Sequence, residues 1–312
     1  MITVAGLTPS LDLTYLVDDL RLGEIHRPTQ LLACAGGKSL NMARVAHRLG
    51  ADVRVIAVLG GPTGDNVAAR LSVDGVAFDV VGSPVETRTC VSIASAGHDE
   101  LTEVYQYAPP MPSEVWRRFL ATADVDLTRR PGWLAISGAP PAELPDDALA
   151  DLIRLAHARG VRAAVDTHGP ALSAAIDVGP ELVKVNRAEA AELVGVPADQ
   201  ADLADLAARI RARSGGIVVI TDGRAGALGL TGDQILRVRP PSRIGRFPVG
   251  SGDAFLGALV AGLDRGRAVA DALRDAAAAG TANALLPGPG TLDPRTVAEI
   301  AATTEVSEVA TG

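Results

Sequence analysis

A short stretch near the C-terminal end combines residue types that could carry phosphoryl-transfer chemistry. Gly250 and Gly252 flank Ser251, and Asp253 follows directly, ahead of a small-residue helix pattern at 254–263. Such a loop exposes backbone N–H groups, and a helix N-terminus attracts anions because its first N–H groups have no internal partner. An aspartate is unfavourable beside an anion unless it has a chemical task, such as taking a proton from a hydroxyl that attacks a bound phosphate. We therefore predict a phosphoryl-transfer site here, with an ordinary strand–helix turn as the alternative interpretation.

A second glycine loop, near the N-terminus, also leads into a helix. Gly36 and Gly37 precede Lys38, and Asn41 falls on the first helical turn. The Gly-Lys-Ser sequence suggests a P-loop, but that motif needs a glycine at position 32, where the chain has Leu32. We expect instead a loop that lies beneath a polar small molecule, with Lys38 supplying a charge for a phosphate and Asn41 an amide.

The pattern of apolar runs predicts the elements that would position these loops. Strands are predicted at 2–7, 53–59, 76–81, 89–94, 101–107, 133–136, 162–165, 182–185 and 217–221. Helices are predicted at 40–49, 113–120, 146–158, 188–194, 202–213, 254–263 and 268–285, and one more follows the loop at 60–65 and ends at about 71. This alternation indicates an α/β fold with a doubly wound, mostly parallel sheet flanked by helices. Ligands collect at the carboxyl ends of such strands, where Asp12, Asn186, Asp222 and the 250–253 loop fall.

Two segments depart from the α/β rhythm. Residues 13–34 and 86–108 contain short runs in which apolar and polar residues alternate, which is typical of strands. We expect them to form a small β lid within a single domain that spans 1–312. The lid could cover the site alone or pair with a second subunit in a homodimer, because exposed strand edges favour pairing. A proline-rich linker follows, and Ser113 is predicted to cap the next helix.

Composition excludes several classes of protein. The 312 residues carry a formal net charge of −8, which argues against nucleic acid as the main partner. No apolar run approaches the roughly 20 residues that span a bilayer, so no membrane partner is expected. The two cysteines, Cys34 and Cys90, make neither a disulfide framework nor a metal cluster. With no basic, apolar leader at the N-terminus, we expect a cytoplasmic protein.

Nearly the whole chain resembles the ribokinase-like (PfkB) carbohydrate kinases, and in particular the branch that contains 1-phosphofructokinase, tagatose-6-phosphate kinase and minor-type 6-phosphofructokinase. The similarity is carried by two long motifs, at 35–44 and 248–255, and by shorter matches at 8–12, 136–138, 183–189, 221–226 and 278–283. The resemblance implies ATP-dependent phosphorylation of a hexose phosphate (fructose 1-phosphate, tagatose 6-phosphate or fructose 6-phosphate) to a bisphosphate.

The resemblance also implies catalytic roles. Asp253 would accept the proton of the attacked sugar hydroxyl, and an aspartate with its ordinary pKa of about 3.9 is already ionised at pH 7, so no large shift is needed. The backbone N–H groups of Gly250, Ser251 and Gly252 would stabilise charge on the transferred phosphoryl group.

On the nucleotide side, the resemblance implies an ATP site lined by Lys184, Asn186, Thr221, Gly223, Gly226 and Asn283. The alternative for Asn283 is an amide that only packs within its helix. Asn186 and Glu189 match an Asn-x-x-Glu motif linked to Mg²⁺, with the contact made through water, because Mg²⁺ usually keeps several waters. Activation by a monovalent cation is left open.

On the sugar side, Asp12 would hold hydroxyl groups, with Gly36, Gly37 and Asn41 beneath the substrate. Lys38 and Arg88 are the candidates for a phosphate already on the sugar, and Lys38 has the better claim because it lies inside the signature loop. The alternative for each is a solvated surface cation.

Four positions depart from the family pattern. Ser39 replaces a usual glycine and could narrow the sugar pocket, Ala139 alters a loop near the sugar, Val185 replaces a proline, and Asp222 places an acid near the ATP phosphates. Ser39 and Ala139 together leave the sugar undetermined. The alternatives that stay open are a kinase of an unphosphorylated sugar or nucleoside, and a catalytically silent relative that binds sugar or nucleotide. A dinucleotide-dependent oxidoreductase is disfavoured because no G-x-G-x-x-G follows the first strand.

Overall fold

A long mixed sheet forms the centre of the protein, for which we use a computed structural model that describes residues 1–96, 101–232, 234–239 and 243–309. Within these residues the sheet has ten strands, and all neighbours from β11 to β5 pair in parallel. In spatial order the strands are β14 (Glu305–Val309), β13 (Gln234–Arg239), β12 (Ala227–Thr231), β11 (Ile217–Thr221), β10 (Leu182–Asn186), β9 (Arg162–Asp166), β8 (Trp133–Ser137), β1 (Ile2–Gly6), β4 (Val53–Leu59) and β5 (Ala77–Gly82).

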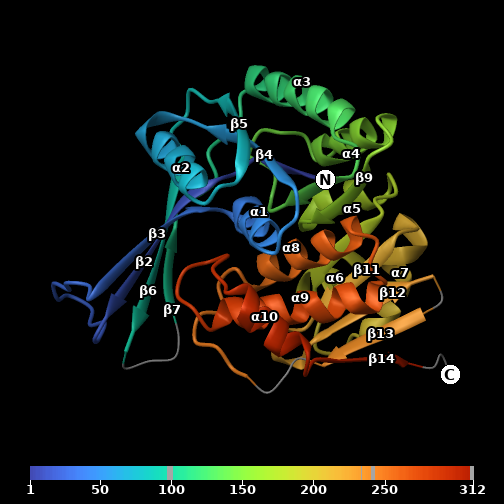
Figure 1. Cartoon of the computed structure of the whole chain (residues 1–312). Coiled ribbons are helices and arrows are strands. Elements are labelled where there is room, and N and C mark those ends of the chain that lie inside the picture. Colours follow the sequence, from blue (N-terminus) through green and yellow to red (C-terminus); the bar gives the residue numbers. More distant parts are fainter. Residues whose placement is uncertain (97–100, 233, 240–242, 310–312) are drawn as a thin grey trace.

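Helices cover both faces of this sheet, giving three layers (Figure 1). One face carries α1 (Lys38–Arg48), α2 (Gly61–Val73), α8 (Ser251–Asp264), α9 (Val269–Ala284) and α10 (Pro294–Ala301). The other face carries α3 (Ser113–Arg129), α4 (Ala148–Ala158), α5 (Gly169–Ile176), α6 (Arg187–Val194) and α7 (Leu203–Ser214). Strand residues alternate between the two cores: Trp133 faces the first and Leu134 the second, as the period of two requires. The fold class predicted from the sequence is confirmed.

Close packing of α8 on α1 brings the two glycine-rich motifs together. A Cβ atom on Gly257, in the middle of α8, would lie 2.5 Å from the carbonyl oxygen of Met42 on α1. Only glycine therefore lets the two helix backbones approach this closely. Since Asp253 stands on the first turn of α8 and Asn41 on the first turn of α1, this contact fixes their separation.

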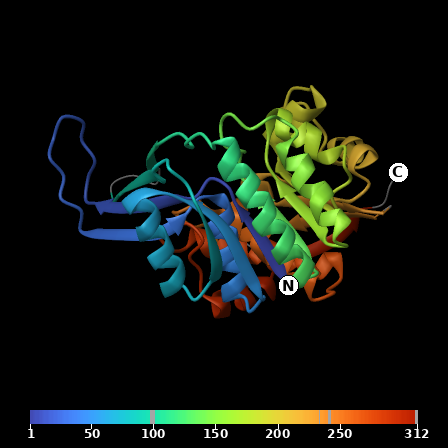
Figure 2. The ribbon, with the colours of Figure 1, turned by 90° about the horizontal axis from the view of Figure 1, so that it is seen from above.

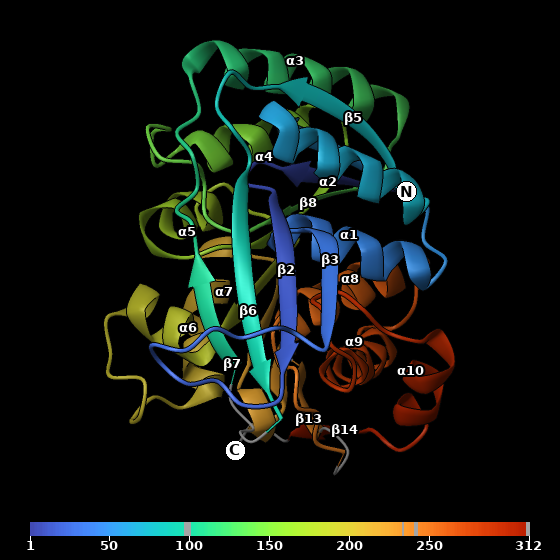
Figure 3. The ribbon, with the colours of Figure 1, turned by 90° about the vertical axis from the view of Figure 1, so that its left-hand side faces the viewer.

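A four-stranded second sheet projects from the body beside the carboxyl ends of the main strands (Figures 2 and 3). Its order is β3 (Gln30–Gly36), β2 (Ser10–Val17), β6 (Arg88–Ser95) and β7 (Leu101–Tyr105). This sheet is the predicted β lid. Asp12 was expected in a loop after the first strand but lies inside β2, opposite Cys34 and Cys90, because the chain enters the lid sheet directly after Pro9.

Several elements were missing from the sequence-based prediction. The prediction omitted α5, α10, the β12–β13 hairpin and β14, and it ended α3 at 120 instead of Arg129. The expected cap at Ser113 was also wrong, because Pro112 occupies the N-cap position and no side chain caps that helix. Among the described residues, no helix is long and apolar enough to cross a membrane.

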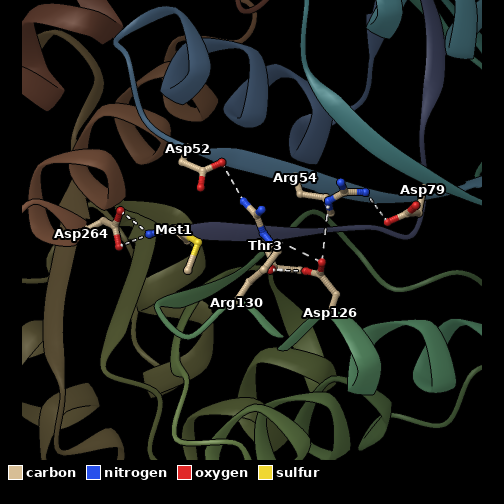
Figure 4. A network of polar contacts seen from close by, with 8 residues as sticks. All are labelled: Met1, Thr3, Asp52, Arg54, Asp79, Asp126, Arg130 and Asp264. Atoms are coloured by element: carbon tan, nitrogen blue, oxygen red, sulfur yellow. Dashed lines mark hydrogen bonds and ion pairs between the residues drawn. The ribbon is translucent and has the colours of Figure 1, made fainter. Parts of the chain in front are cut away.

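A polar network lies at the amino ends of the central strands, at the edge of the sheet away from both glycine loops (Figure 4). Its contacts join Met1 to Asp264, Thr3 to Asp126, Arg54 to Asp79, and Arg130 to Asp52. A cleft of about 630 Å³ lies beside it. Because the arginines there face carboxylates, we interpret the network as a structural tie between β1, α3 and α8.

Candidate active site

Asp253 and Asn41 meet where the two glycine-rich motifs come together. The Asn41 Nδ2 donates a hydrogen bond of 3.0 Å to Asp253 Oδ2, across 212 residues of sequence. Both residues are buried: Asp253 is 6% exposed and Asn41 is 4% exposed. Gly250 precedes α8 in the left-handed region, with φ of 79°, a conformation that favours glycine. The loop thus turns sharply and presents Asp253 to a residue from the other half of the predicted site.

The environment of Asp253 shifts its pKa, although its proposed role does not require a shift. Burial raises the pKa of Asp253 to about 6, although the Asn41 hydrogen bond and the Lys38 ammonium act to lower it. The neighbouring Asp166 carboxylate adds to the rise and Lys184 opposes it. A base with a pKa near 6 is still mainly ionised at pH 7, and it binds a proton more readily than an ordinary aspartate.

A cluster of opposite charges surrounds Asp253. Asp166, at the carboxyl end of β9, is fully buried, and Lys184 Nζ lies 2.6 Å from its Oδ2. Lys38 Nζ lies 3.5 Å from Asp166 Oδ1 and 3.9 Å from Glu189 Oε1. Burial opposes ionisation of Asp166, but the two ammonium groups lower its pKa overall. In turn the Asp166 carboxylate is the main cause that raises the pKa of Lys38.

Asp166 was not among the residues predicted for the site. Its position at the end of a buried parallel strand was a usable signal, but no motif singled it out. The ammonium of Lys38 belongs to this cluster and therefore lies on the side of the glycine loop at 250–252. That placement weakens the argument that Lys38 rather than Arg88 receives a phosphate already on the sugar.

The glycine loop before α8 has free amides at two of the three predicted positions. Within the described residues, the N–H groups of Gly250 and Gly252 have no hydrogen-bond partner, whereas the Ser251 N–H donates to the Pro248 carbonyl at 3.0 Å. A Cβ on Gly252 would lie 3.2 Å from Lys184 Nζ, so an anion on this loop would also meet an ammonium. In this conformation the Ser251 N–H is not available to an anion, contrary to the expectation.

Asn283 supports the same loop through buried hydrogen bonds. Its side chain is fully buried, and its Nδ2 donates to the Val249 carbonyl at 2.8 Å and to Ser251 Oγ at 3.2 Å. Its Oδ1 accepts from the Gly290 N–H at 2.8 Å. The prediction that Asn283 contacts ATP is therefore corrected, because every polar atom of its side chain is used within the protein.

The remaining residues predicted for the nucleotide lie together at the carboxyl ends of β10 and β11. Asn186 pairs with Thr221 in the sheet register, and a tight turn follows in which Gly223 and Gly226 have φ of 51° and 99°. Asp222 was expected to place a negative charge near ATP, but both of its oxygens accept from Arg187, at 2.9 and 2.7 Å.

Asn186 and Glu189 form a reciprocal capping box at the start of α6. The Glu189 N–H donates to Asn186 Oδ1 at 2.9 Å, and the Asn186 N–H donates to Glu189 Oε2 at 2.8 Å. Glu189 Oε1 is left facing the charge cluster. No group of three or more His, Cys, Asp or Glu suited to a metal occurs among the described residues. Glu189 Oε1, which no hydrogen bond within the capping box uses, is the type of oxygen ligand that Mg²⁺ accepts.

The predicted sugar side is formed where the lid joins the body. Asp12 Oδ1 accepts from Ser10 Oγ at 2.5 Å, and its Oδ2 lies 3.4 Å from the Gly37 N–H. A Cβ on Gly36 would fall 1.9 Å from the Asp12 carboxyl carbon, so a side chain at position 36 would displace this carboxylate. Burial raises the pKa of Asp12, and hydrogen bonds from Ser10 and Gly37 oppose the rise.

Arg88 stands next to this acid, at the start of β6. It is paired in the sheet register with Ser10, and its Nη2 donates to the Thr8 carbonyl at 3.1 Å. Its Nε is buried with no partner among the described residues. Of the two departures near the sugar, Ser39 is buried within α1, and the Ala139 carbonyl accepts from Thr8 Oγ1 at 3.4 Å.

Comparisons with known proteins identify a family model, a relative and solved structures that this chain resembles. Residues 1–295 match the model for "pfkB family carbohydrate kinase". The chain is 32% identical over 276 residues to 1-phosphofructokinase of Haloferax volcanii, which covers 88% of each chain. Phosphofructokinase-2 of Escherichia coli has a similar structure in its complex with potassium (28% identity, TM-score 0.89), with fructose-6-phosphate (27%, 0.87) and in its tetrameric inhibited form (28%, 0.87). Each of these alignments covers 96% of this chain and 98% of the other.

Proposed function

The chain belongs to the pfkB family of carbohydrate kinases, and on that premise we propose that it transfers a phosphoryl group from ATP to a hydroxyl of a hexose phosphate. The observation that carries this proposal is the position of Asp253, which is buried against Asn41 and stands beside the free amides of Gly250 and Gly252. In this proposal the base and the anion site lie within one helical turn of each other. Membership of the family makes the protein a sugar kinase; the phosphorylated acceptor is the further step.

In the proposed reaction, Asp253 takes the proton of the attacking sugar hydroxyl. The hydroxyl oxygen forms a bond to the γ-phosphorus of ATP, the bond from that phosphorus to the bridging oxygen breaks, and ADP leaves. The Gly250 and Gly252 amides, with Lys38 and Lys184 nearby, would offset the charge on the phosphoryl group during transfer. Asn41 keeps the carboxylate in one orientation, so that most of the catalytic effect is positional.

We assign the existing phosphate of the sugar to Arg88 and the hydroxyls to Asp12. Arg88 adjoins Asp12 across the lid strands, and its buried Nε lacks a partner among the described residues. A guanidinium can meet a phosphate with two parallel hydrogen bonds. The relatives named 1-phosphofructokinase and phosphofructokinase-2 support fructose 1-phosphate and fructose 6-phosphate as the first acceptors to test.

Mg²⁺ would bind with the nucleotide, and Glu189 Oε1 is the carboxylate oxygen that we expect to reach it through water. A bound Mg²⁺ supplies positive charge to the phosphates. The potassium complex of the Escherichia coli relative supports a test of monovalent cations for this chain. The cytoplasmic location expected from the sequence remains a prediction.

A turnover assay on a panel of sugars tests the acceptor class. We expect ADP formation with ATP and a hexose phosphate, and at least 100-fold lower kcat/KM with the corresponding free hexose, because a charged hydrogen bond to the phosphate would be lost. In Arg88→Met, turnover of the hexose phosphate should fall and that of the free sugar should hardly change. Equal turnover of free sugars and sugar phosphates would favour the unphosphorylated-sugar alternative, and inactivity on the whole panel would favour the silent relative.

We also propose that the lid pairs with the lid of a second copy. The face of the lid opposite Asp12 carries apolar side chains on adjacent strands, among them Leu13, Tyr15 and Val91. Leu31 and Val104 on the same face are 51% and 62% exposed. A patch of this kind favours association, and the Escherichia coli relative has been solved as a tetramer.

A further inference from the structure

Arg44 is a buried arginine that touches both halves of the site without facing the substrate. It is 1% exposed and lies on α1, one turn beyond Asn41. Its Nε donates to Asp74 Oδ2 at 2.7 Å, and its Nη1 lies 3.4 Å from Asn41 Oδ1. Its Nη2 donates to the carbonyl of Ala35 at the end of lid strand β3. A buried arginine is costly unless its charge is balanced and its nitrogens have acceptors. Here the charge faces Asp74, and each of the three guanidinium nitrogens has at least one acceptor.

The guanidinium determines which way the Asn41 amide points. With Arg44 on one side and Asp253 on the other, the Asn41 oxygen faces the cation and the Nδ2 faces the carboxylate. The reversed amide would place oxygen against the carboxylate and N–H groups against the guanidinium, which is unfavourable on both sides. Without Arg44, only the contact with Asp253 would set this orientation.

The same guanidinium also supports the loop behind Gly250. Arg44 Nη1 donates to the Pro289 carbonyl at 3.0 Å, and a Cβ on Gly290 would lie only 2.8 Å from that nitrogen. Pro289 in turn packs on Gly250, where an added Cβ would lie 2.8 Å from the Pro289 Cβ. Arg44 therefore contacts the lid strand, the amide partner of the base and the support of the glycine loop.

We propose that Arg44 is a positioning residue for catalysis, which orients Asn41 toward Asp253 and holds the end of lid strand β3 and the Pro289 segment in register with it. This inference rests on the proposed function, in which Asp253 is the base. The other charged groups around Asp253 are Lys38 from α1, Asp166 from β9 and Lys184 from β10, and none of them contacts Arg44.

The test is the pH dependence of kcat at saturating substrates in Arg44→Lys, with Asn41→Ala as the reference. Lysine keeps the charge beside Asp74 but cannot reach all the acceptors of the guanidinium. We expect kcat to fall about 10- to 100-fold. We also expect the acid limb, the low-pH side of the plot of kcat against pH, to move to a higher pH by about half to one unit, as in Asn41→Ala. The reason is that the hydrogen bond that favours the ionised base is weakened. Ionisation of the substrate phosphates is common to all variants and cancels in the comparison.

Arg70→Met is the matched control. Arg70 also donates to a lid-strand carbonyl, that of Ala33 at 2.6 Å, but has no contact with Asn41. We expect its acid limb to coincide with that of the wild type. If Arg44→Lys does not fold, Arg44→Met/Asp74→Asn removes both charges together and serves in its place.

The outcomes separate the two proposals. An acid limb that moves in Asn41→Ala but stays at the wild-type position in the folded Arg44 variant overturns the role of Arg44 alone. A shift in Arg70→Met equal to that in Arg44→Lys would also overturn it, since loss of a lid contact would then suffice. Wild-type turnover in Asp253→Asn would instead overturn the proposed function.

Discussion

Burial gives Asp253 a property that its sequence motif does not reveal. The motif identifies an acid beside an anion loop, but its pKa depends on the residues that surround it in the folded chain. Those residues come from α1, β9 and β10, and the removal of water outweighs the favourable charges, so that the pKa rises to about 6. The end of a buried strand could have indicated Asp166, but its ion pairs and the contact of Asp253 with Asn41 join segments far apart in the sequence, and no local pattern predicts them.

Titration of Asp253 in the free protein should therefore differ from that of an ordinary aspartate. We expect its carboxyl carbon to titrate near pH 6 in a ¹³C NMR experiment, with a signal that is missing in Asp253→Asn. Since the base acts when ionised, turnover should fall as the pH drops below about 6. A carboxyl that titrates near pH 4 would show that burial does not control this group.

Replacing Asp166 should lower the free energy of unfolding far more than replacing an acid that is less deeply buried. In Asp166→Asn, the Lys184 and Lys38 ammonium groups lose their buried counter-charge, so we expect the free energy of unfolding to fall by about 3–5 kcal/mol in a urea titration. Asp222→Asn removes the partner of Arg187 in a more exposed pair and should cost about 1 kcal/mol or less. Similar costs for the two variants would contradict the structural role of Asp166.

At the level of elements, the sequence predicted most of the parallel core. The strands at β1, β4, β8, β10 and β11 are short apolar runs that end in polar or glycine residues, and such runs are typical of buried parallel strands. The omitted α5 and α10 begin with Gly169-Pro170 and Asp293-Pro294. Proline in the first turn is a start signal for helices, and the sequence-based prediction did not use it at these two positions.

The distance between α1 and α8 decides whether the two motifs form one site. In Gly257→Ala, the new Cβ would lie 2.5 Å from the Met42 carbonyl, so the helices must move apart. We expect a loss of about 1–3 kcal/mol in the free energy of unfolding and a lower kcat, because the Asn41 contact with Asp253 lengthens. Gly82→Ala is the control, since a Cβ there has nothing within 4 Å and should change neither quantity; a Gly257→Ala protein with wild-type stability and kcat would contradict the account.

For the whole molecule, the fold of the body and the strands of the lid could be predicted from the sequence, but the position of the lid on the body could not. The body follows from the α/β alternation, and the lid strands were predicted from their short alternating runs. How the lid sits over the strand ends depends on buried contacts such as that of Arg44 with Ala35, which no local pattern encodes. The lid also has an apolar face on which Leu31 and Val104 are exposed to solvent.

Association through that face can be tested by replacing its exposed apolar side chains with charged ones. Leu31→Glu/Val104→Glu should convert a dimer into a monomer in analytical ultracentrifugation, because burying two carboxylates in each copy is unfavourable. Val73→Glu, on an exposed position of α2 that is 88% accessible, should leave the dimer intact. A wild-type protein that sediments as a monomer would contradict association through the lid.

The most direct test of the central claim is the kcat of Asp253→Asn on the best acceptor of the panel, with ATP binding followed in parallel by thermal shift. If Asp253 is the base for phosphoryl transfer, kcat should fall by about 10²- to 10⁴-fold, while ATP still stabilises the variant as it does the wild type. A kcat within tenfold of the wild type, with ATP binding intact, would contradict the assignment of Asp253 and with it the proposed mechanism.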